Sequence, residues 1–591
     1  MIRMLDEDPH PDSVPLMERD AVVDNMLVPD EQRSKRDLLL LTAPFFSLQL
    51  AWSIQQVFGI PHLASLSIPD TLIPLLVISG PVAGILVPPI VAALSENIES
   101  PLGKRKPFIY AGGCGTILSF IFLGAAKPIA IGLSHAFGGS DSSEITVTAT
   151  RAIAGLSIYA LNFSIQPLAL GLRASVVDYF GPLQQSDANL WIGRFSSLGS
   201  ISMALFGLSY SPAFWVLCIA VIALIGIMLV AVAVVAATKD TDLPNREVPI
   251  KKRNGSRLTT RAHVVKILTR ARRLPPITRW TCKVQLVSWV AWFFVLNYTS
   301  VLVSRMYGKP EVSRDGAGAS TTAQVDHTKV VSGVALLFHS ASLVGLVLVS
   351  AVWEGPSPSA SLPVQEKGEG DIEEREILGS GSIPRERSRH ADMDNESDNT
   401  TLAITERSVE ANIFQRRNLL ARRVWRPALL MLAGSIFGTT TLLTVAPQVS
   451  ASVIIASILL GANGALFSLS NWVPYSLIAY EAATRARSRR TRRVYEEASV
   501  FGQQNSGGDY GFDKDGLGET GNMVGESDEE THTDDTPILL AVHQMAITIP
   551  QVVAGIASSL LMKVLEALGI QQGVWCIFAL SVPAAVWAAC L

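Results

Sequence analysis

Long apolar blocks constrain the fold of this chain more than any other feature. The 591 residues are 49% hydrophobic and only 17% charged, and most charges lie between the blocks. Each block has the length of about 20 residues that a helix needs to cross a bilayer. A soluble protein would instead alternate apolar and polar residues at helix or strand period. The pattern predicts an all-α polytopic membrane protein and excludes compact soluble enzymes and nucleic-acid-binding proteins.

Twelve blocks reach the length of a membrane span. A window of about 19 residues places them in two sets of six, so we expect twelve transmembrane helices in two pseudo-symmetric six-helix bundles. The predicted spans are 38–59, 71–94, 108–126, 152–175, 190–209, 213–237, 280–303, 330–353, 427–446, 451–479, 537–562 and 572–590.

Polar segments complete the predicted domain organisation. The two bundles cover 38–237 and 280–591, a basic central loop covers 238–279, and a polar tail covers 1–37. Two insertions interrupt the second bundle, and they contain too few apolar residues to form a core. The insertions predicted to be disordered are 354–424 and 494–536.

Positive charge between the spans predicts the orientation of the chain. Lys104, Arg105 and Lys106 follow span 2, the central loop is basic, and an arginine-rich run follows span 10. Basic loops stay on the cytosolic side of a membrane, and in a twelve-span chain these loops share one side with both termini. We therefore expect cytosolic termini and a location in the plasma membrane, with the vacuolar membrane as the alternative.

Polar side chains form stripes on spans 1, 4, 7 and 10. Residues three or four positions apart share one face of a helix, and polar groups at bilayer depth usually face a bundle interior or an aqueous cavity. Such groups either form hydrogen bonds between helices, which stabilise the bundle by about 0.6 kcal/mol each, or bind a polar solute. The candidate binding residues are Gln49, Trp52, Gln56, Asn162, Gln166, Arg173, Gln285, Trp289, Trp292 and Asn471.

Arg173 is the most informative member of these stripes. A guanidinium near the membrane core costs about 2.5–3.5 kcal/mol, which favours a role in pairing or ligand binding. Its fixed N–H donors can grip adjacent hydroxyl groups, and an indole can stack on the C–H face of a sugar. The stripes therefore suit a polyhydroxylated ligand, although composition alone does not separate a sugar from another polar solute.

Seven segments resemble the sucrose and α-glucoside transporters, the glycoside-pentoside-hexuronide cation symporters of the major facilitator superfamily, in their fungal form. The resemblance covers nearly all of the membrane portion and excludes the insertions. Its segments are SLQLAWS at 47–53, SGPVAGILVPPIVAALSENIESPLGKRKPFI at 79–109, LNFSIQPLALGLRASVVD at 161–178, QQSDANLWIGRF at 184–195, VQLVSWVAWFFVLNYTS at 284–300, NWVPYSLIAYE at 471–481 and HQMAITIPQ at 543–551.

This resemblance implies the major facilitator fold, with alternating access around a central sugar site. It also implies a cytosolic gating motif in the loop after span 2, with Glu96 where the family usually has Asp. The basic residues of that motif are expected to pair with acidic residues at helix exits. The residues assigned to gating are Glu96, Lys104, Arg105, Lys106, Asp178 and Glu481. Plain anchoring by positive charge is the alternative explanation of the basic cluster.

One departure from the family bears on energy coupling. The family has an Asp in span 4 that takes the coupling proton, and this chain has Asn162 in its place. An amide does not titrate, so proton symport is implied by the resemblance but opposed by this residue. Because the unperturbed pKa of histidine is about 6.5, His339 and His543 are candidate proton relays, with ordinary packed histidines as the alternative.

The sequence thus predicts membrane transport of a sucrose-like or maltose-like glycoside, with proton symport in question. An uncoupled facilitator and a non-transporting sugar sensor are the alternatives. The expected partners are a sugar, protons and the lipid bilayer, without nucleic acid. No nucleophile–base set or metal-ligand spacing lies in the spans, so we expect no enzymatic activity, cofactor or metal. The five cysteines all fall in predicted spans, where they are expected to be buried apolar residues.

Overall fold

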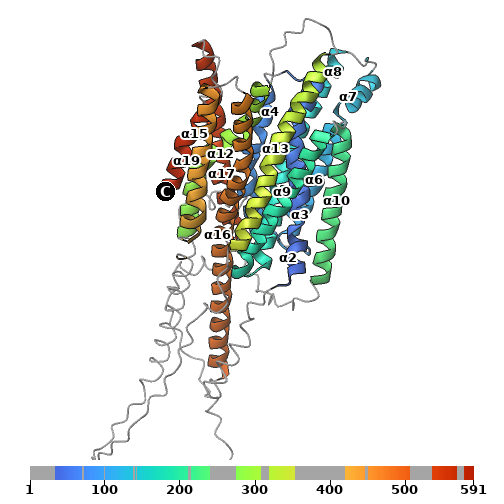
Figure 1. Ribbon diagram of the computed structural model, residues 1–591. Helices are drawn as coiled ribbons and strands as arrows, with labels where there is room; N and C mark the ends of the chain where they lie inside the picture. Colours follow the sequence, from blue (N-terminus) through green and yellow to red (C-terminus); the bar gives the residue numbers. More distant parts are fainter. Residues whose placement is uncertain are drawn as a thin grey trace, which may run out of the picture.

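The computed structural model of the protein is a bundle of long helices (Figure 1). No strand occurs among the residues that it describes, which confirms the all-α prediction. The described residues are 33–69, 72–98, 100–137, 140, 143–209, 214–239, 274–307, 319–352, 415, 419–445, 450–505, 536–568 and 578–591.

The helices fall into two sets that correspond to the two predicted bundles. The N half contains α2 (Lys35–Thr42), α3 (Pro44–Ser65), α4 (Ile73–Val77), α5 (Ser79–Asn97), α6 (Lys106–Gly124), α7 (Ala126–Ala136), α8 (Glu144–Tyr179), α9 (Gln185–Ser209) and α10 (Phe214–Lys239). The C half contains α12 (Pro276–Tyr307), α13 (Ala319–Val352), α15 (Arg426–Val445), α16 (Ser450–Asn505), α17 (Thr536–Ala567) and α19 (Ser581–Cys590).

Each predicted span overlaps one or two of these helices. Nine helices of the described part are long and apolar enough to cross a membrane. The three other predicted spans overlap α9, α12 and α19, and part of the last span, 572–577, lies outside the described residues. Local sequence explains where helices begin: at α8, the side chain of Ser143 accepts a hydrogen bond from the Thr146 amide, and Glu144 lies in the first turn.

Three elements differ from the sequence prediction. The stretch 127–151, expected to be a loop, contains α7, which buries Ala126, Ala130 and Ser134. This four-residue spacing forms one helical face, but α7 is too short for a search for membrane spans to detect it. Helix α16 continues to Asn505 and so includes the start of the predicted insertion 494–536, while a short π-helix at Ala421–Trp425 ends the insertion 354–424.

Each half has its own hydrophobic core. One cluster of buried residues comes entirely from the N half and another entirely from the C half. Close helix approach within a half depends on glycine at Gly112 of α6, because a Cβ atom there would lie 2.6 Å from the Leu168 backbone nitrogen and 2.8 Å from the Ser164 carbonyl oxygen. In the C half, a Cβ atom at Gly464 of α16 would collide with the Phe338 carbonyl group of α13.

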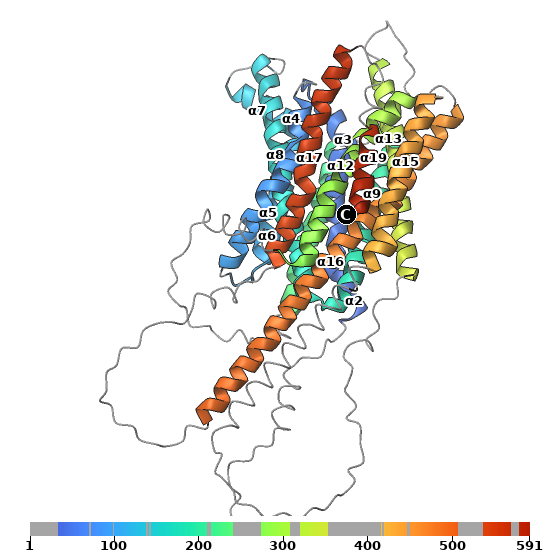
Figure 2. The same cartoon turned by 90° about the vertical axis from the view of Figure 1, so that its left-hand side faces the viewer.

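The loop at 100–105 and the starts of α2, α12 and α15 lie at the end of the bundle from which α16 projects, and we call this end the basic end (Figures 1 and 2). Helices α4 and α7 lie at the opposite end (Figure 1).

The two halves contact each other closely at the basic end. Ala92 and Ala93 of α5 pack against Ile538 and Ala541 of α17, and Figure 2 shows α17 between α5 and α12. A second mixed cluster joins Val177 of α8 to α16 and α17.

Hydrogen bonds between described residues also cross between the halves. Trp472 Nε1 donates to the Ser186 carbonyl at 3.1 Å, Arg194 Nη2 donates to Ser350 Oγ at 2.6 Å, and the hydroxyls of Ser197 and Ser342 lie 2.9 Å apart. The structure is therefore a conformation in which the basic end is closed.

Candidate functional site

Arg173 lies at the interface between the two halves, near the basic end. It is six residues before the end of α8, or about 9 Å at 1.5 Å per residue. Its Cζ atom lies 3.6 Å from the centre of the Tyr475 ring of α16 and 5.4 Å from the centre of the Phe45 ring of α3. The guanidinium thus stacks on an aromatic ring of the opposite half, where the sequence suggested neutral amides and indoles.

Two polar residues of α17 complete the surroundings of Tyr475. The Tyr475 hydroxyl donates to Gln544 Oε1 at 3.4 Å. The rings of Tyr475 and His543 meet at 90°, with their centroids 4.6 Å apart. His543 has no exposed surface, and neither of its ring nitrogens has a hydrogen-bond partner among the described residues. Arg173, Tyr475, His543 and Gln544 therefore form a polar cluster that draws on both halves.

Asn162 has a local hydrogen-bonding role in this conformation. Its Nδ2 donates to Ser79 Oγ at 2.9 Å and to the Ile158 carbonyl at 3.0 Å. The first bond ties α8 to α5, and the second remains within α8. The donor group of the buried Asn162 amide is thus engaged inside the N half.

The C-half stripe is packed in a similar way. Gln285 is buried, and its Nε2 donates to the Ser470 carbonyl of α16 at 3.3 Å. Trp292 is also buried and meets the Phe467 ring edge-on at 5.1 Å, and Trp289 meets the same ring at 6.2 Å. Trp292 Nε1 has no hydrogen-bond partner among the described residues.

Other predicted binding residues differ in exposure. Gln49 and Trp52 are half-buried, and Trp52 packs against the N-half core. Gln56 is exposed and Gln166 is buried. Asn471 is half-buried, and its Nδ2 donates to the Phe467 carbonyl of its own helix at 3.2 Å. Their assignment to a sugar site stays a prediction.

The predicted gating residues separate into two groups. Arg105 and Asp178 form an ion pair with an Nε–Oδ2 distance of 2.7 Å, and the Arg105 side chain is 10% exposed. Lys104 is exposed and Lys106 is half-buried. The Glu96 side chain lies outside the described residues. The pairing expected between the basic cluster and Asp178 is therefore present, and both partners belong to the N half.

Glu481 has different partners from those that the sequence suggested. It is buried, and its Oε2 accepts hydrogen bonds from the Thr278 amide at 2.8 Å and from the Thr278 hydroxyl at 2.7 Å. Arg485, one turn later on α16, lies 3.6 Å from Oε1. Glu481 thus satisfies free N–H groups at the start of α12, and its described bonds remain within the C half instead of reaching Lys104, Arg105 or Lys106.

His339, the second candidate proton relay, lies on α13 and meets the ring of its neighbour Phe338 edge-on at 5.3 Å. Sequence reasoning missed Tyr475, Gln544 and Phe45 as site residues. A usable signal existed for Tyr475, because it lies four residues after Asn471 and therefore extends that stripe by one turn.

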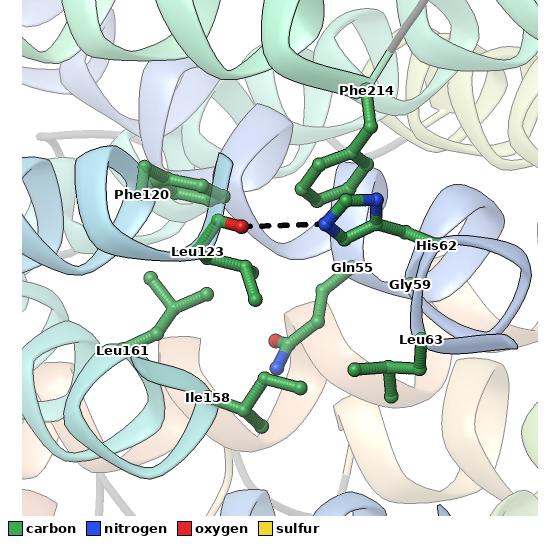
Figure 3. Close-up of a pocket in the computed structure, with 9 residues that line it drawn as sticks. All are labelled: Gln55, Gly59, His62, Leu63, Phe120, Leu123, Ile158, Leu161 and Phe214. Carbon is green, nitrogen blue, oxygen red and sulfur yellow. Dashed lines mark hydrogen bonds between the residues drawn. The ribbon is translucent and has the colours of Figure 1, made fainter. Parts of the chain in front are cut away.

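A small pocket lies inside the N half, away from these residues (Figure 3). His62 Nε2 lies 3.3 Å from the Leu123 carbonyl oxygen, and the His62 ring stacks on Phe214 at 3.7 Å. Apart from Gln55 and His62, the lining side chains are apolar. None of the predicted binding residues lines this pocket.

Several known proteins share sequence similarity with this chain. No family model matches the chain. A general alpha-glucoside permease of Schizosaccharomyces pombe is 24% identical over 495 residues, which cover 79% of this chain and 84% of that protein. The chain is similar to proteins named as α-glucoside and sucrose transporters. Sucrose transport protein SUT2 of Oryza sativa subsp. indica is 30% identical over 176 residues, and SUT5 is 28% identical over 316 residues.

The matches to the rice proteins are partial, since the chain spans 33% of the length of SUT2 and 57% of SUT5. Among solved structures, the major facilitator superfamily transporter FucP is 12% identical over 94% of this chain, with a TM-score of 0.45, and the proton:xylose symporter XylE has a TM-score of 0.46. The relatives are named as a permease and transport proteins, which confirms the expectation of a non-enzymatic membrane transporter.

Proposed function

We propose that this protein transports a glycoside of the sucrose or maltose type by alternating access between its two halves. The observation that carries the proposal is the contact of Arg173 with Tyr475, where a guanidinium from one half meets an aromatic ring from the other at the closed end. The names of the permease and sucrose transport relatives supply the substrate class.

The proposed binding residues lie on helices from both halves. Arg173 would exchange its ring contact for sugar hydroxyls when the basic end opens, because a guanidinium can serve both partners. Trp292 Nε1 and Ser470 Oγ are buried without described hydrogen-bond partners. Unsatisfied buried donors cost about 1–3 kcal/mol each, so a bound sugar or water in another conformation would relieve that cost.

Uptake of labelled sucrose and maltose into vesicles containing the full chain tests the proposal. Accumulation driven by an imposed pH gradient supports symport, equilibration alone supports a facilitator, and binding without flux supports a sensor. Arg173→Ala should abolish uptake and binding. Arg151→Ala is the matched control on the same helix, because Arg151 Nε donates to the Ser67 carbonyl near the opposite end. Uptake by Arg173→Ala at the level of the control would remove Arg173 from the site.

We further propose that the basic end faces the cytosol of a plasma-membrane protein. Basic residues at this end include the half-buried Lys106 and exposed Lys104, in agreement with the retention of positive charge on the cytosolic side. A cysteine introduced at the exposed Leu102 should react with an impermeant maleimide only after the cells are opened. Labelling of intact cells would reverse the orientation.

A further inference from the structure

His543 combines complete burial with unsatisfied hydrogen-bonding capacity. It lies on α17 near the closed basic end, with no exposed surface and with both ring nitrogens unpartnered among the described residues. A buried polar group without a partner is costly and usually has a functional or structural explanation. Gln544, its neighbour in the chain, accepts the hydrogen bond from Tyr475.

The Tyr475 ring places His543 close to Arg173. Arg173 Cζ lies 3.6 Å from the ring centre, and the imidazole centroid lies 4.6 Å from it. Among the described contacts of the Tyr475 and His543 rings, the charged side chain is that of Arg173. From α5, the side chains near this part of α17 include Val91, Ala92 and Ala93, which are all apolar. The side chain of Glu96, which is also on α5, lies outside the described residues.

Helix α12 brings no further charge in its described contacts with α17. Phe293 lies close to Gly555, and the Tyr298 hydroxyl donates to Ser558 Oγ at 2.8 Å. Both contacts lie about three turns or more along α17 from His543. Whether His543 is neutral or protonated therefore decides whether a second positive charge lies beside the aromatic ring on which Arg173 stacks.

We propose that His543 binds the coupling proton, and that its protonation releases Arg173 from Tyr475 and opens the basic end. The proposal rests on the proposed function of alternating-access transport. Like charges in a poorly solvated site repel strongly, so an imidazolium at His543 destabilises the closed conformation. One proton binds to a free ring nitrogen before opening and leaves toward the basic end afterwards. His543 thus replaces the titratable group that Asn162 lacks.

The distance between labels on the two halves tests whether protonation of His543 opens the basic end. This measurement needs no substrate. Spin labels are attached to cysteines introduced at Leu102 in the N half and Ala486 in the C half, both exposed, in a chain without its native cysteines. In reconstituted wild-type protein, the open population should rise at least tenfold between pH 8 and pH 5. His543→Gln should show the same small open population at both pH values. His62→Gln, which changes an imidazole at the opposite end, should respond as the wild type does.

Labelled maltose uptake gives the second readout. His543→Gln should equilibrate maltose but lose accumulation under a pH gradient, while His62→Gln keeps accumulation. A wild type that transports nothing would overturn the proposed function, and the distance measurement would still decide on the switch. A pH-independent wild-type distance, or a wild-type response in His543→Gln, would overturn the role of His543. His543→Asn and size-exclusion profiles identify any variant that does not fold.

Discussion

Replacing Tyr475 with leucine measures how strongly its contact with Arg173 holds the basic end closed. Leucine keeps much of the apolar volume but has no π system, so the cation–π interaction at 3.6 Å is lost. Such interactions contribute about 0.5–1 kcal/mol at exposed sites and about 2 kcal/mol when desolvated. Both side chains are half-buried, which places this contact at about 1–2 kcal/mol. Since a free-energy change of 1.4 kcal/mol changes an equilibrium constant tenfold, the open population should rise about 5- to 30-fold.

Cysteine alkylation can detect that rise. Ala482 is buried in the cluster that joins the halves at the basic end, so Ala482→Cys should react with a hydrophilic maleimide only in the open state. Tyr475→Leu should speed the reaction about 5- to 30-fold, as the population argument requires. Tyr475→Phe keeps the ring and loses only the weak 3.4 Å bond to Gln544, so its rate should stay near that of wild type. Equal rates for the Leu and Phe variants would refute the reasoning.

Three further predictions concern packing, capping and coupling. Gly112→Ala should lower the melting temperature in detergent, because overpacking against the α8 backbone costs about 1–3 kcal/mol, whereas Gly226→Ala, with open space around it, should not. Thr278→Val should cost about 1.5–3 kcal/mol by removing a hydroxyl bond to the Glu481 carboxylate, and thermal unfolding should show that Thr278→Ser retains most of it. Asn162→Asp should give sugar uptake a stronger pH dependence, and an unchanged pH profile would show that a carboxylate at this position does not couple uptake to protons.

The membrane helices were predictable because a single physical requirement governs them. Backbone groups in hydrocarbon must form hydrogen bonds within their own segment, which favours a helix. The side chains of such a helix are mostly apolar, so each span carries a long apolar block that hydropathy can detect. Helix α7 and the extension of α16 to Asn505 are not under that requirement. Helix α7 is too short, and the end of α16 is too polar, for a hydropathy window to detect.

The candidate site was predictable only in part, because a polar stripe identifies a helix face and not its partner. Asn162 and Gln285 lie on the predicted faces, yet each donates to a neighbouring helix of its own half. Arg173 was recognisable from its charge in an apolar block. Tyr475 extends the Asn471 stripe by one turn, but that position does not reveal its partner, because the contact with Arg173 joins segments far apart in the chain.

The contacts inside each half differ in kind from the contacts between the halves. This difference affects how the protein can move. Within the halves, the described ties include ones that involve charged groups, such as Arg105 with Asp178 and Glu481 with Thr278. Hydrogen bonds to charged groups contribute about 1.5–3 kcal/mol each. Between the halves at the basic end, the ring contact of Arg173 is joined by small apolar side chains, by one hydrogen bond from the charged Arg194, and by neutral hydrogen bonds such as that of Trp472. The neutral bonds contribute about 0.5–1.5 kcal/mol each and can be exchanged for water. Separation of the halves as rigid bodies therefore costs less than rearrangement inside either one.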